Sequence, residues 1–317
     1  MTGRTGKASV VGAGACGSAI AQRLAEYDVF ATIALTDAIP GRAEGVALDL
    51  AQSRTLVGFD TDVVGRTITA DGAGCDVLAS SDVVVLTAGV PRREGVGRNE
   101  RAEATAAIVE SNAHWIAEHA PGAVVVVISN PMEEMTALTR QVTGFPHQRV
   151  FGMGNLLDSA RLASFIAAET GAPASAVRAL TCGPGGADMV AVESACTVGG
   201  RAAREMLPAG VFDRLVARTR TGGAEVADLL RTGSAWFAPS AAVARLVRAV
   251  HLDTREVLPV CAWLTGECGA GYLGVTAELG AGGVRRVVLP PLTAEQTRAL
   301  VTPVNGPSLS ASWEKEC

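Results

Sequence analysis

Three glycines near the start of the chain have the spacing that binds a dinucleotide. The segment Val10-Val11-Gly12-Ala13-Gly14-Ala15-Cys16-Gly17 predicts an apolar strand, a G-x-G-x-x-G turn and the first turn of a helix. Gly12 permits a tight turn, Gly14 lets the backbone approach a pyrophosphate, and Gly17 lets the helix pack closely on the strand. Free N–H groups at the start of the helix can then bind the phosphates.

An acidic residue follows at the distance that this kind of site requires. Asp37 ends the next predicted strand, about 20 residues after the glycine turn. A carboxylate there accepts hydrogen bonds from a ribose diol and repels a 2′-phosphate. The pattern therefore predicts NAD, and not NADP, as the cofactor. The alternative is a glycine turn in a sheet that binds nothing.

Three further segments carry arginine, asparagine and aspartate side chains. They are Leu86-Thr87-Ala88-Gly89-Val90-Pro91-Arg92-Arg93-Glu94-Gly95-Val96-Gly97-Arg98, Ser129-Asn130-Pro131 and Leu157-Asp158-Ser159-Ala160-Arg161. Two supporting segments are Gly222-Gly223-Ala224-Glu225 and Gly233-Ser234-Ala235-Trp236-Phe237-Ala238-Pro239. In their order along the chain, these segments resemble those of the malate/lactate dehydrogenase family, with bacterial malate dehydrogenases as the nearest branch.

The resemblance implies roles for individual residues in binding substrate and cofactor. In the family, a loop like the one at residues 89–98 closes over the substrate. Arg98 matches the arginine that polarises the reacting carbonyl, and Arg161 matches the one that clamps the substrate carboxylate as a two-pronged fork. Arg92 matches the position that holds a second carboxylate in malate enzymes, and Asn130 matches a group beside the nicotinamide. The other implied cofactor contacts are Thr87, Ala88 and Gly89.

One expected catalytic residue is missing from the sequence. The family carries its proton-transfer histidine in a Gly-Gly-His-Gly-Asp segment, which corresponds here to Cys182-Gly183-Pro184-Gly185-Gly186-Ala187-Asp188-Met189-Val190. Gly185 stands at the histidine position, and Ala187 stands at the position of the aspartate that follows. The histidines of the chain lie elsewhere, at His114, His119, His147 and His251.

The loss changes what the remaining residues can do. A positioned acid or base is worth roughly 10²–10⁴-fold in rate, so ordinary malate turnover should be slow. Asp158, which would orient the imidazole in the family, must find another hydrogen bond or pair with Arg161, or its pKa should rise. Glycine at position 185 also leaves space for water or a larger substrate. A thiol from Cys182 or Cys196 is an alternative acid, although both residues read more simply as small core residues.

Alternating apolar and helical segments in the first half must position these residues. Continuous valine and isoleucine runs are typical of parallel strands covered on both faces. The predicted fold class is α/β, with a Rossmann-type doubly wound parallel sheet followed by an α+β substrate domain. The predicted strands are Ala8–Val11, Ala31–Leu35, Thr61–Val64, Asp82–Leu86 and Val124–Ile128. The predicted helices are Ala15–Tyr27, Arg42–Ala51, Asn99–His119 and Met132–Gln141.

The second half has a different pattern, and we place the domain boundary near residue 150. Residues 1–150 form the predicted NAD-binding domain, and residues 151–317 the predicted substrate domain, with a loose tail from Pro303. A glycine-rich stretch at 177–198 predicts mixed strand and loop. The predicted helices are Leu156–Thr170, Val211–Leu230, Ala241–Val250 and Thr293–Leu300. An antiparallel meander is predicted at Val257–Trp263, Gly274–Leu279 and Val284–Val288.

Composition narrows the classes of function. The formal net charge of −5 argues against a nucleic-acid partner, which would need clustered positive charge. The longest apolar run, Ala123–Ile128, is far short of the roughly 20 residues that span a membrane. The seven cysteines, without paired spacing, predict reduced thiols, no metal site and a cytoplasmic protein. The resemblance adds a small anionic substrate and a homodimer or homotetramer.

Three functions compete at this point. The first is an NAD-dependent oxidoreductase with altered proton transfer, acting on a small dicarboxylate-like 2-hydroxy, 2-keto or imino acid. A protonated imine, for example, needs only hydride. The second is a repurposed enzyme of specialised metabolism that uses the arginines for non-redox chemistry. The third is a catalytically silent NAD-binding relative. Retention of Arg92, Arg98, Asp158 and Arg161 argues against a decayed site.

The acid at position 37 should set cofactor preference. We expect the chain to bind NADH more tightly than NADPH, because the Asp37 carboxylate repels a 2′-phosphate. Replacing it in Asp37→Ser should narrow the ratio of the two affinities. Fluorescence titration with each cofactor measures this ratio, and equal affinities in the unchanged protein would contradict the prediction.

Overall fold

The computed structural model describes residues 3–90, 98–231, 233–266 and 269–301. The predicted tail from Pro303 lies outside these residues. The chain divides into two compact units. The first unit comprises Met1–Gly152, Trp236–Glu256 and Leu279–Val284, and the second comprises Met153–Ala235, Val257–Glu278 and Arg285–Cys317. The predicted boundary near residue 150 stays a prediction.

The first unit is built on a parallel sheet with strand order β3-β2-β1-β4-β5-β6. These strands are β1 (Lys7–Val11), β2 (Thr32–Asp37), β3 (Asp62–Thr67), β4 (Val83–Leu86), β5 (Val124–Val127) and β6 (Val150–Gly152). The order reverses between β1 and β4. In such sheets a ligand binds outside the carboxyl ends of the strands at this switch point. The predicted α/β doubly wound fold is confirmed.

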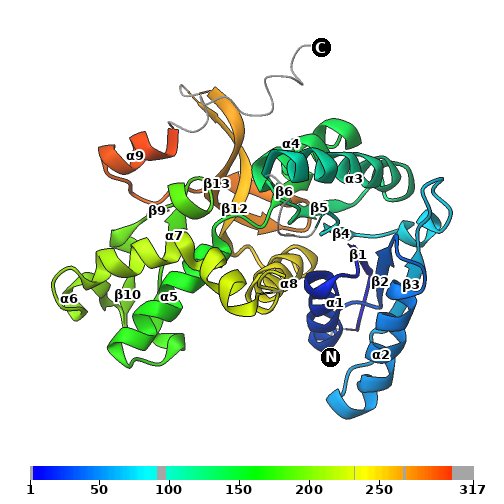
Figure 1. Ribbon diagram of the computed structural model, residues 1–317, viewed down its shortest axis with the longest axis horizontal. Coiled ribbons are helices and arrows are strands. Elements are labelled where there is room, and N and C mark those ends of the chain that lie inside the picture. Colours follow the sequence, from blue (N-terminus) through cyan, green and yellow to red (C-terminus); the bar gives the residue numbers. More distant parts are fainter. Residues whose placement is uncertain (1–2, 91–97, 232, 267–268, 302–317) are drawn as a thin grey trace. The chain divides into compact units, whose positions relative to one another are not determined.

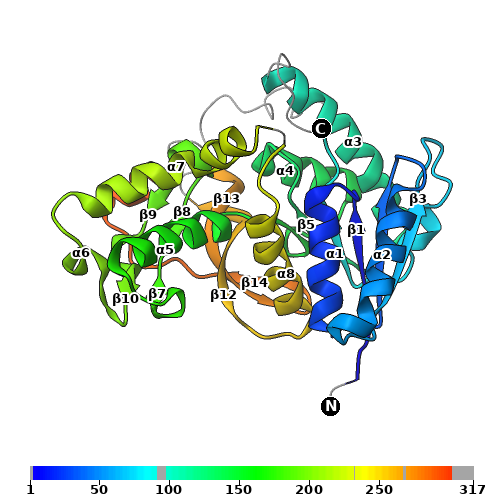
Figure 2. The same ribbon diagram turned by 60° about the horizontal axis from the view of Figure 1, so that its bottom comes forward.

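Helices cover the sheet of the first unit (Figures 1 and 2). They are α1 (Ala15–Tyr27), α2 (Arg42–Val57), α3 (Arg98–His119), α4 (Met132–Thr143) and α8 (Phe237–His251), with short 3-10 turns η1 (Cys75–Leu78) and η2 (His147–Arg149). Helix α3 packs with α4, and α1 packs with α8. The core under α3 and α4 is aliphatic, with Val84, Leu86, Val109 and Ile116 fully buried.

Two helices are longer than the sequence pattern predicts. Helix α2 continues past Ala51 to Val57 and ends where Gly58 adopts a positive φ of 90°. Its last turn carries exposed Leu56 and Val57, so no amphipathic period marks it. Helix α8 begins before Ala241 and includes Pro239 in its first turn, where the missing N–H has no helical partner to lose.

The second unit combines two long helices with short strands. Its helices are α5 (Leu156–Thr170), α6 (Ala203–Met206), α7 (Val211–Leu230) and α9 (Ala294–Val301), with 3-10 turns η3 (Ala174–Ala176), η4 (Gly186–Asp188) and η5 (Glu193–Ala195). Its strands are β7 (Val177–Arg178), β8 (Thr181–Cys182), β9 (Val190–Ala191), β10 (Thr197–Val198), β11 (Arg201–Ala202), β12 (Val257–Gly266), β13 (Gly269–Gly280) and β14 (Gly283–Val287). Strands β13 and β14 run across the division between the two units. The antiparallel pairing of β12 with β13 confirms the first hairpin of the predicted meander. Helices α5 and α7 share an apolar core that includes Leu162, Ile166 and Phe212.

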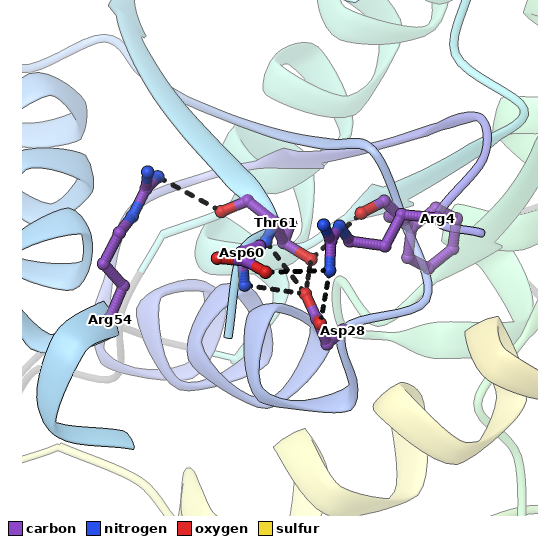
Figure 3. Close-up of polar contacts among 6 residues, drawn as sticks. Arg4, Asp28, Arg54, Asp60 and Thr61 are labelled. Atoms are coloured by element: carbon purple, nitrogen blue, oxygen red, sulfur yellow. Dashed lines mark hydrogen bonds and ion pairs between the residues drawn. The ribbon is translucent and has the colours of Figure 1, made fainter. Parts of the chain in front are cut away.

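A polar cluster ties the N-terminal segment to the end of α1 (Figure 3). Asp28 caps α1 in the left-handed region, with φ of 52°. Its Oδ1 accepts hydrogen bonds from the Asp60 and Thr61 N–H groups, both at 2.9 Å, and its Oδ2 lies 2.7 Å from Arg4 Nη1. Burial opposes ionisation of Asp28, but these hydrogen bonds outweigh it and hold the pKa below its ordinary value.

Removing the charge of Asp28 should destabilise the first unit. Asp28→Asn tolerates the left-handed backbone, but it weakens charged hydrogen bonds that are each worth about 1.5–3 kcal/mol. Because the folded pKa is depressed, the difference in unfolding free energy should be full above pH 3.8 and shrink as pH falls below it. Urea unfolding across this range measures it.

The matched control is Asp60→Asn. The Asp60 side chain is 78% exposed and reaches only Arg4 Nη1, at 3.3 Å. Exposed pairs of this kind contribute about 0–1 kcal/mol. An equal loss of stability in both variants would contradict a specific role for Asp28.

Candidate functional site

The glycine turn of the first unit has the geometry of a phosphate cradle. Gly12 has a φ of 106°, and a Cβ placed on it would lie 2.7 Å from Thr87 Oγ1. A Cβ on Gly17 would lie 1.8 Å from the Gly12 carbonyl oxygen, so only glycine fits there. Gly14 faces open space, with nothing within 4 Å of its Cβ position. A ligand can therefore reach the backbone at the start of α1, and the residues present fit a dinucleotide.

Strand β4 delivers the neighbouring wall of this turn. The Thr87 N–H donates to the Val11 carbonyl at 2.9 Å, and Thr87 Oγ1 donates to the Gly12 carbonyl at 3.2 Å. Ser129 Oγ donates to the Ala88 carbonyl at 2.5 Å, which links the ends of β4 and β5. These bonds fix the segment that begins the predicted closing loop. The sites predicted at Thr87, Ala88 and Gly89 thus lie at the switch point of the sheet.

Asp37 is placed at the end of β2 and already holds the glycine turn. Its Oδ2 accepts a hydrogen bond from the Ala13 N–H at 2.8 Å, and its Oδ1 accepts one from the Ile39 N–H at 2.9 Å. Arg42 Nη1 lies 3.7 Å from the same carboxylate. A variant at Asp37 therefore also loosens the turn. The ratio of affinities for NADH and NADPH, and not either affinity alone, reports on the charge.

The structure describes only part of the predicted closing loop. Arg98 is the first residue of α3, on the carboxyl side of the loop. Arg92 lies outside the described residues, as do Gly95 and Gly97. Asn130 follows β5, and its Nδ2 donates to the Ile128 carbonyl at 3.1 Å. The roles of these residues stay predictions.

A second cluster lies in the first turn of α5, within the second unit. The guanidinium of Arg161 donates from Nη1 to Asp158 Oδ1 at 2.9 Å, and the Asp158 side chain is 8% exposed. Asp158 Oδ2 accepts only a long bond, 3.4 Å from the Gly186 N–H. Burial raises the pKa of Asp158, although Arg161 and the Gly186 N–H oppose the rise. The buried carboxylate is therefore paired with Arg161 and has a raised pKa, and the interpretation of Gly185 as the histidine position stays a prediction.

A side chain at position 185 would begin beside this carboxylate. A Cβ placed on Gly185 would lie 3.8 Å from Asp158 Oδ2, with nothing else within 4 Å. Its φ of −67° suits any residue, so the backbone does not require glycine. The surrounding segment is anchored, because the Gly183 N–H donates to the Gly274 carbonyl at 2.7 Å. Arg220 Nε also donates to the Met189 carbonyl at 3.3 Å.

Within the described residues, Asp158 receives hydrogen bonds from Arg161 and Gly186, and none from a histidine or from Cys182. The four histidines all belong to the first unit. His251 closes α8, where its ring stacks on Phe30 at 3.9 Å between centroids. Cys182 is fully buried, and burial raises the pKa of its thiol to about 12. A thiol so far from neutral titration is a poor proton carrier, which favours the small-core-residue interpretation of Cys182.

A glycine pair in α7 completes the cluster, and only the family resemblance marked it in the sequence. A Cβ on Gly222 would lie 3.2 Å from Arg161 Cδ, and one on Gly223 would lie 3.6 Å from Arg161 Nη2. Larger residues would therefore press on the guanidinium. Two adjacent glycines inside a helix weaken it by roughly 0.5–1 kcal/mol each relative to alanine. The two helix-weakening glycines were therefore the sequence signal that could have marked Gly222 and Gly223 as functional positions.

The described residues contain neither a group suited to bind a metal ion nor a helix suited to span a membrane. Within the described ranges, histidine, cysteine and acidic side chains form no group of three suited to a metal ion. Among the helices that the structure describes, none has the length and apolar content that crossing a bilayer requires.

Comparison with known proteins agrees with this arrangement. Residues 6–152 match the lactate/malate dehydrogenase NAD-binding domain, and residues 156–305 match the lactate/malate dehydrogenase alpha/beta C-terminal domain. A malate dehydrogenase from Methanosarcina mazei is 40% identical, covering 93% of this chain and 94% of that protein. The apo malate dehydrogenase structure from Picrophilus torridus is similar with a TM-score of 0.90 and 33% identity, covering 94% of each chain.

A ligand-bound structure is also similar. The lactate dehydrogenase of Cryptosporidium parvum, complexed with lactic acid and nicotinamide adenine dinucleotide, has a TM-score of 0.88 and 32% identity, covering 96% of each chain.

The half-buried guanidinium of Arg161 should be required for anion binding. Arg161→Ala should weaken the binding of malonate or tartronate by well over tenfold, because removing one partner of a buried charge pair typically costs about 2–5 kcal/mol. NADH binding should change little, because the glycine turn belongs to the other unit. Calorimetric titration of the NAD complex with each acid measures the effect.

The control for bulk charge is Arg178→Ala, which removes the same charge from an exposed position on β7. Equal weakening in both variants would show general electrostatics and not a site. Absence of any acid binding to the unchanged protein would favour the silent relative.

Proposed function

The chain belongs to the lactate/malate dehydrogenase family of NAD-dependent oxidoreductases, and on that premise we propose that it interconverts a small anionic 2-hydroxy and 2-keto acid, or an imino acid and its amine, without a histidine at position 185. The observation that carries the proposal is that a Cβ on Gly185 would meet only Asp158 Oδ2, at 3.8 Å, with no other described atom within 4 Å. The retained ion pair beside that space supports a working anion site.

The cofactor and the protein contribute different parts of the reaction. When bound, NAD supplies or accepts the hydride at its nicotinamide ring. The backbone between Gly12 and Gly17 holds the pyrophosphate, and Asp37 selects the unphosphorylated ribose. Neither step depends on the lost histidine. Cofactor binding should therefore be ordinary even where turnover is not.

Arg161 orients the substrate by its carboxylate. A guanidinium presents parallel N–H groups in a rigid fork that matches a carboxylate, which a lysine cannot do. Its Nη1 is committed to Asp158, and the glycine pair in α7 places no side chain against the guanidinium. A second carboxylate would need a second cation. Arg92, with Arg98 at the carbonyl, is the proposed source on the closing loop.

The proton is the step that differs from the family pattern. Reducing a ketone by hydride leaves an alkoxide that needs a proton, and the reverse reaction needs a base. Asp158 Oδ2 faces the space that an imidazole would fill. A water held there by Asp158 can relay the proton, or the substrate can carry its own. Both routes leave Asp158 as the group that receives or stabilises the positive charge.

The cellular setting of the enzyme forms part of the proposal. We place it in the cytoplasm as a homodimer or homotetramer, in keeping with the family resemblance. The NAD-binding domain at residues 1–150 and the substrate domain at residues 151–317 remain the proposed functional division. Light scattering on the purified protein measures the oligomeric state.

Restoring the family residues should restore ketone reduction. Gly185→His with Ala187→Asp should raise the rate of oxaloacetate reduction by roughly 10²–10⁴-fold, because the imidazole then meets Asp158. NADH absorbance measures the rate. Ala187→Asp alone is the matched control and should give no comparable gain. Free imidazole should also stimulate the unchanged protein more than the double variant.

Two outcomes would count against the proposal. An unchanged protein that reduces oxaloacetate at about 1–10³ per second, the usual range for enzymes, would show that no proton donor is missing. A protein that binds acids but never oxidises NADH with any 2-oxo or imino acid would favour non-redox chemistry.

A further inference from the structure

The Asp158 carboxylate has one oxygen whose hydrogen-bonding capacity is barely used. Oδ1 is paired with Arg161 at 2.9 Å. Oδ2 has only the Gly186 N–H at 3.4 Å, beyond the usual 2.7–3.2 Å of an N–H···O bond. The carboxylate is nevertheless buried. A buried anionic oxygen strongly favours a further donor.

In the described part of the second unit, no basic side chain forms a hydrogen bond or an ion pair with Asp158 Oδ2. It contains no histidine, and its single lysine, Lys315, lies outside the described residues. Arg161 is committed to Oδ1, and Arg220 donates to the Met189 carbonyl. The position of a Cβ on Gly185 has Oδ2 as its only neighbour within 4 Å. The missing donor can therefore be carried by the ligand.

Charge decides which ligand fits best. A ketone places an oxygen lone pair at its reacting carbon, and this acceptor would face an acceptor at Asp158 unless a proton lay between them. An iminium places an N–H donor there. A 2-imino acid also has its carboxylate on the adjacent carbon. Its two charges thus match Asp158 and Arg161, which themselves touch.

Resting on the proposed function, we propose that the substrate is a 2-imino acid, whose iminium nitrogen lies in the space beside Gly185 and donates to Asp158 Oδ2. Its carboxylate binds Arg161. The enzyme then reduces the imino acid to an amino acid. The absence of a histidine at position 185 changes the substrate specificity as well as removing a proton donor.

The chemistry balances without a proton donor on the protein. A 2-oxo acid and ammonium condense to the iminium and one water. Hydride then forms the new C–H bond at the iminium carbon, the C=N π pair moves to nitrogen as a lone pair, and NADH is oxidised to NAD⁺. The neutral amine takes a proton from solvent and leaves as ammonium. Asp158 stabilises the iminium throughout and stays ionised.

Substrate assays test the inference directly. NADH oxidation is followed with oxaloacetate or pyruvate, in ammonium chloride and in potassium chloride of equal ionic strength, and with 1-pyrroline-2-carboxylate as a preformed cyclic imine. We expect at least one imine-forming mixture or the preformed imine to react more than tenfold faster than the 2-oxo acids in potassium chloride. Mass spectrometry should then find the amino acid, with ¹⁵N incorporated from labelled ammonium.

Variants at position 185 separate the two substrate classes. Gly185→His should lower imine reduction by more than tenfold and raise ketone reduction, because its imidazole occupies the nitrogen site. Gly185→Ala is the milder variant and should shift the same ratio in the same direction. Calorimetry adds a readout without turnover: the unchanged NAD complex should bind aspartate more tightly than malate, and Gly185→His should reverse that order.

The outcomes distinguish this inference from the proposed function. Equal rates in ammonium and potassium, with the cyclic imine inert, overturn the imino-acid substrate and leave a hydroxy-acid enzyme standing. Tighter binding of malate than of aspartate by the unchanged protein overturns it as well. No NADH oxidation with any of these compounds overturns both.

Discussion

The burial of one carboxylate constrains the whole second unit. Asp158 sits in the first turn of α5, 8% exposed, where an uncompensated charge would strongly destabilise the fold. Arg161 neutralises it from one turn along the same helix, and Gly222 in α7 leaves room for Arg161, because a Cβ there would lie 3.2 Å from Arg161 Cδ. The ion pair is therefore both a packing requirement and the feature that gives the unit its chemistry. Replacing either partner should disturb both.

The first unit answers a different constraint, that a phosphate must reach backbone N–H groups. The switch in strand order brings the carboxyl ends of β1 and β4 together, and Gly12 and Thr87 meet there. Asp37 reinforces the turn from β2 by accepting the Ala13 N–H. One carboxylate thus shapes the loop and is proposed to select the ribose. This sharing keeps the proposed cofactor contacts of Asp37 within the first unit, whereas Asp158 and Arg161 belong to the second.

The two clusters diverge in how far they follow the family. The glycine turn keeps every feature that the dinucleotide fingerprint requires, and the substrate cluster keeps its aspartate and arginine. Gly185 and Ala187, which the resemblance places at the histidine and aspartate positions of the family, are the predicted departures in this cluster. Because Gly185 has an ordinary φ, glycine is not demanded by the backbone there. The proposed substrate offers a reason for glycine here, because its iminium would occupy that space and pair with Asp158.

The sequence alone determined the nucleotide turn, the parallel sheet and most helix limits, because glycine spacing and apolar runs are local signals. It missed the last turn of α2 and the first turn of α8, where exposed apolar residues and a proline hide the periodicity. Only the tertiary structure decided that Gly185 faces Asp158 Oδ2, and that α7 lays its glycine pair over Arg161. These contacts join residues far apart in the chain, and their direction depends on packing that no local pattern encodes.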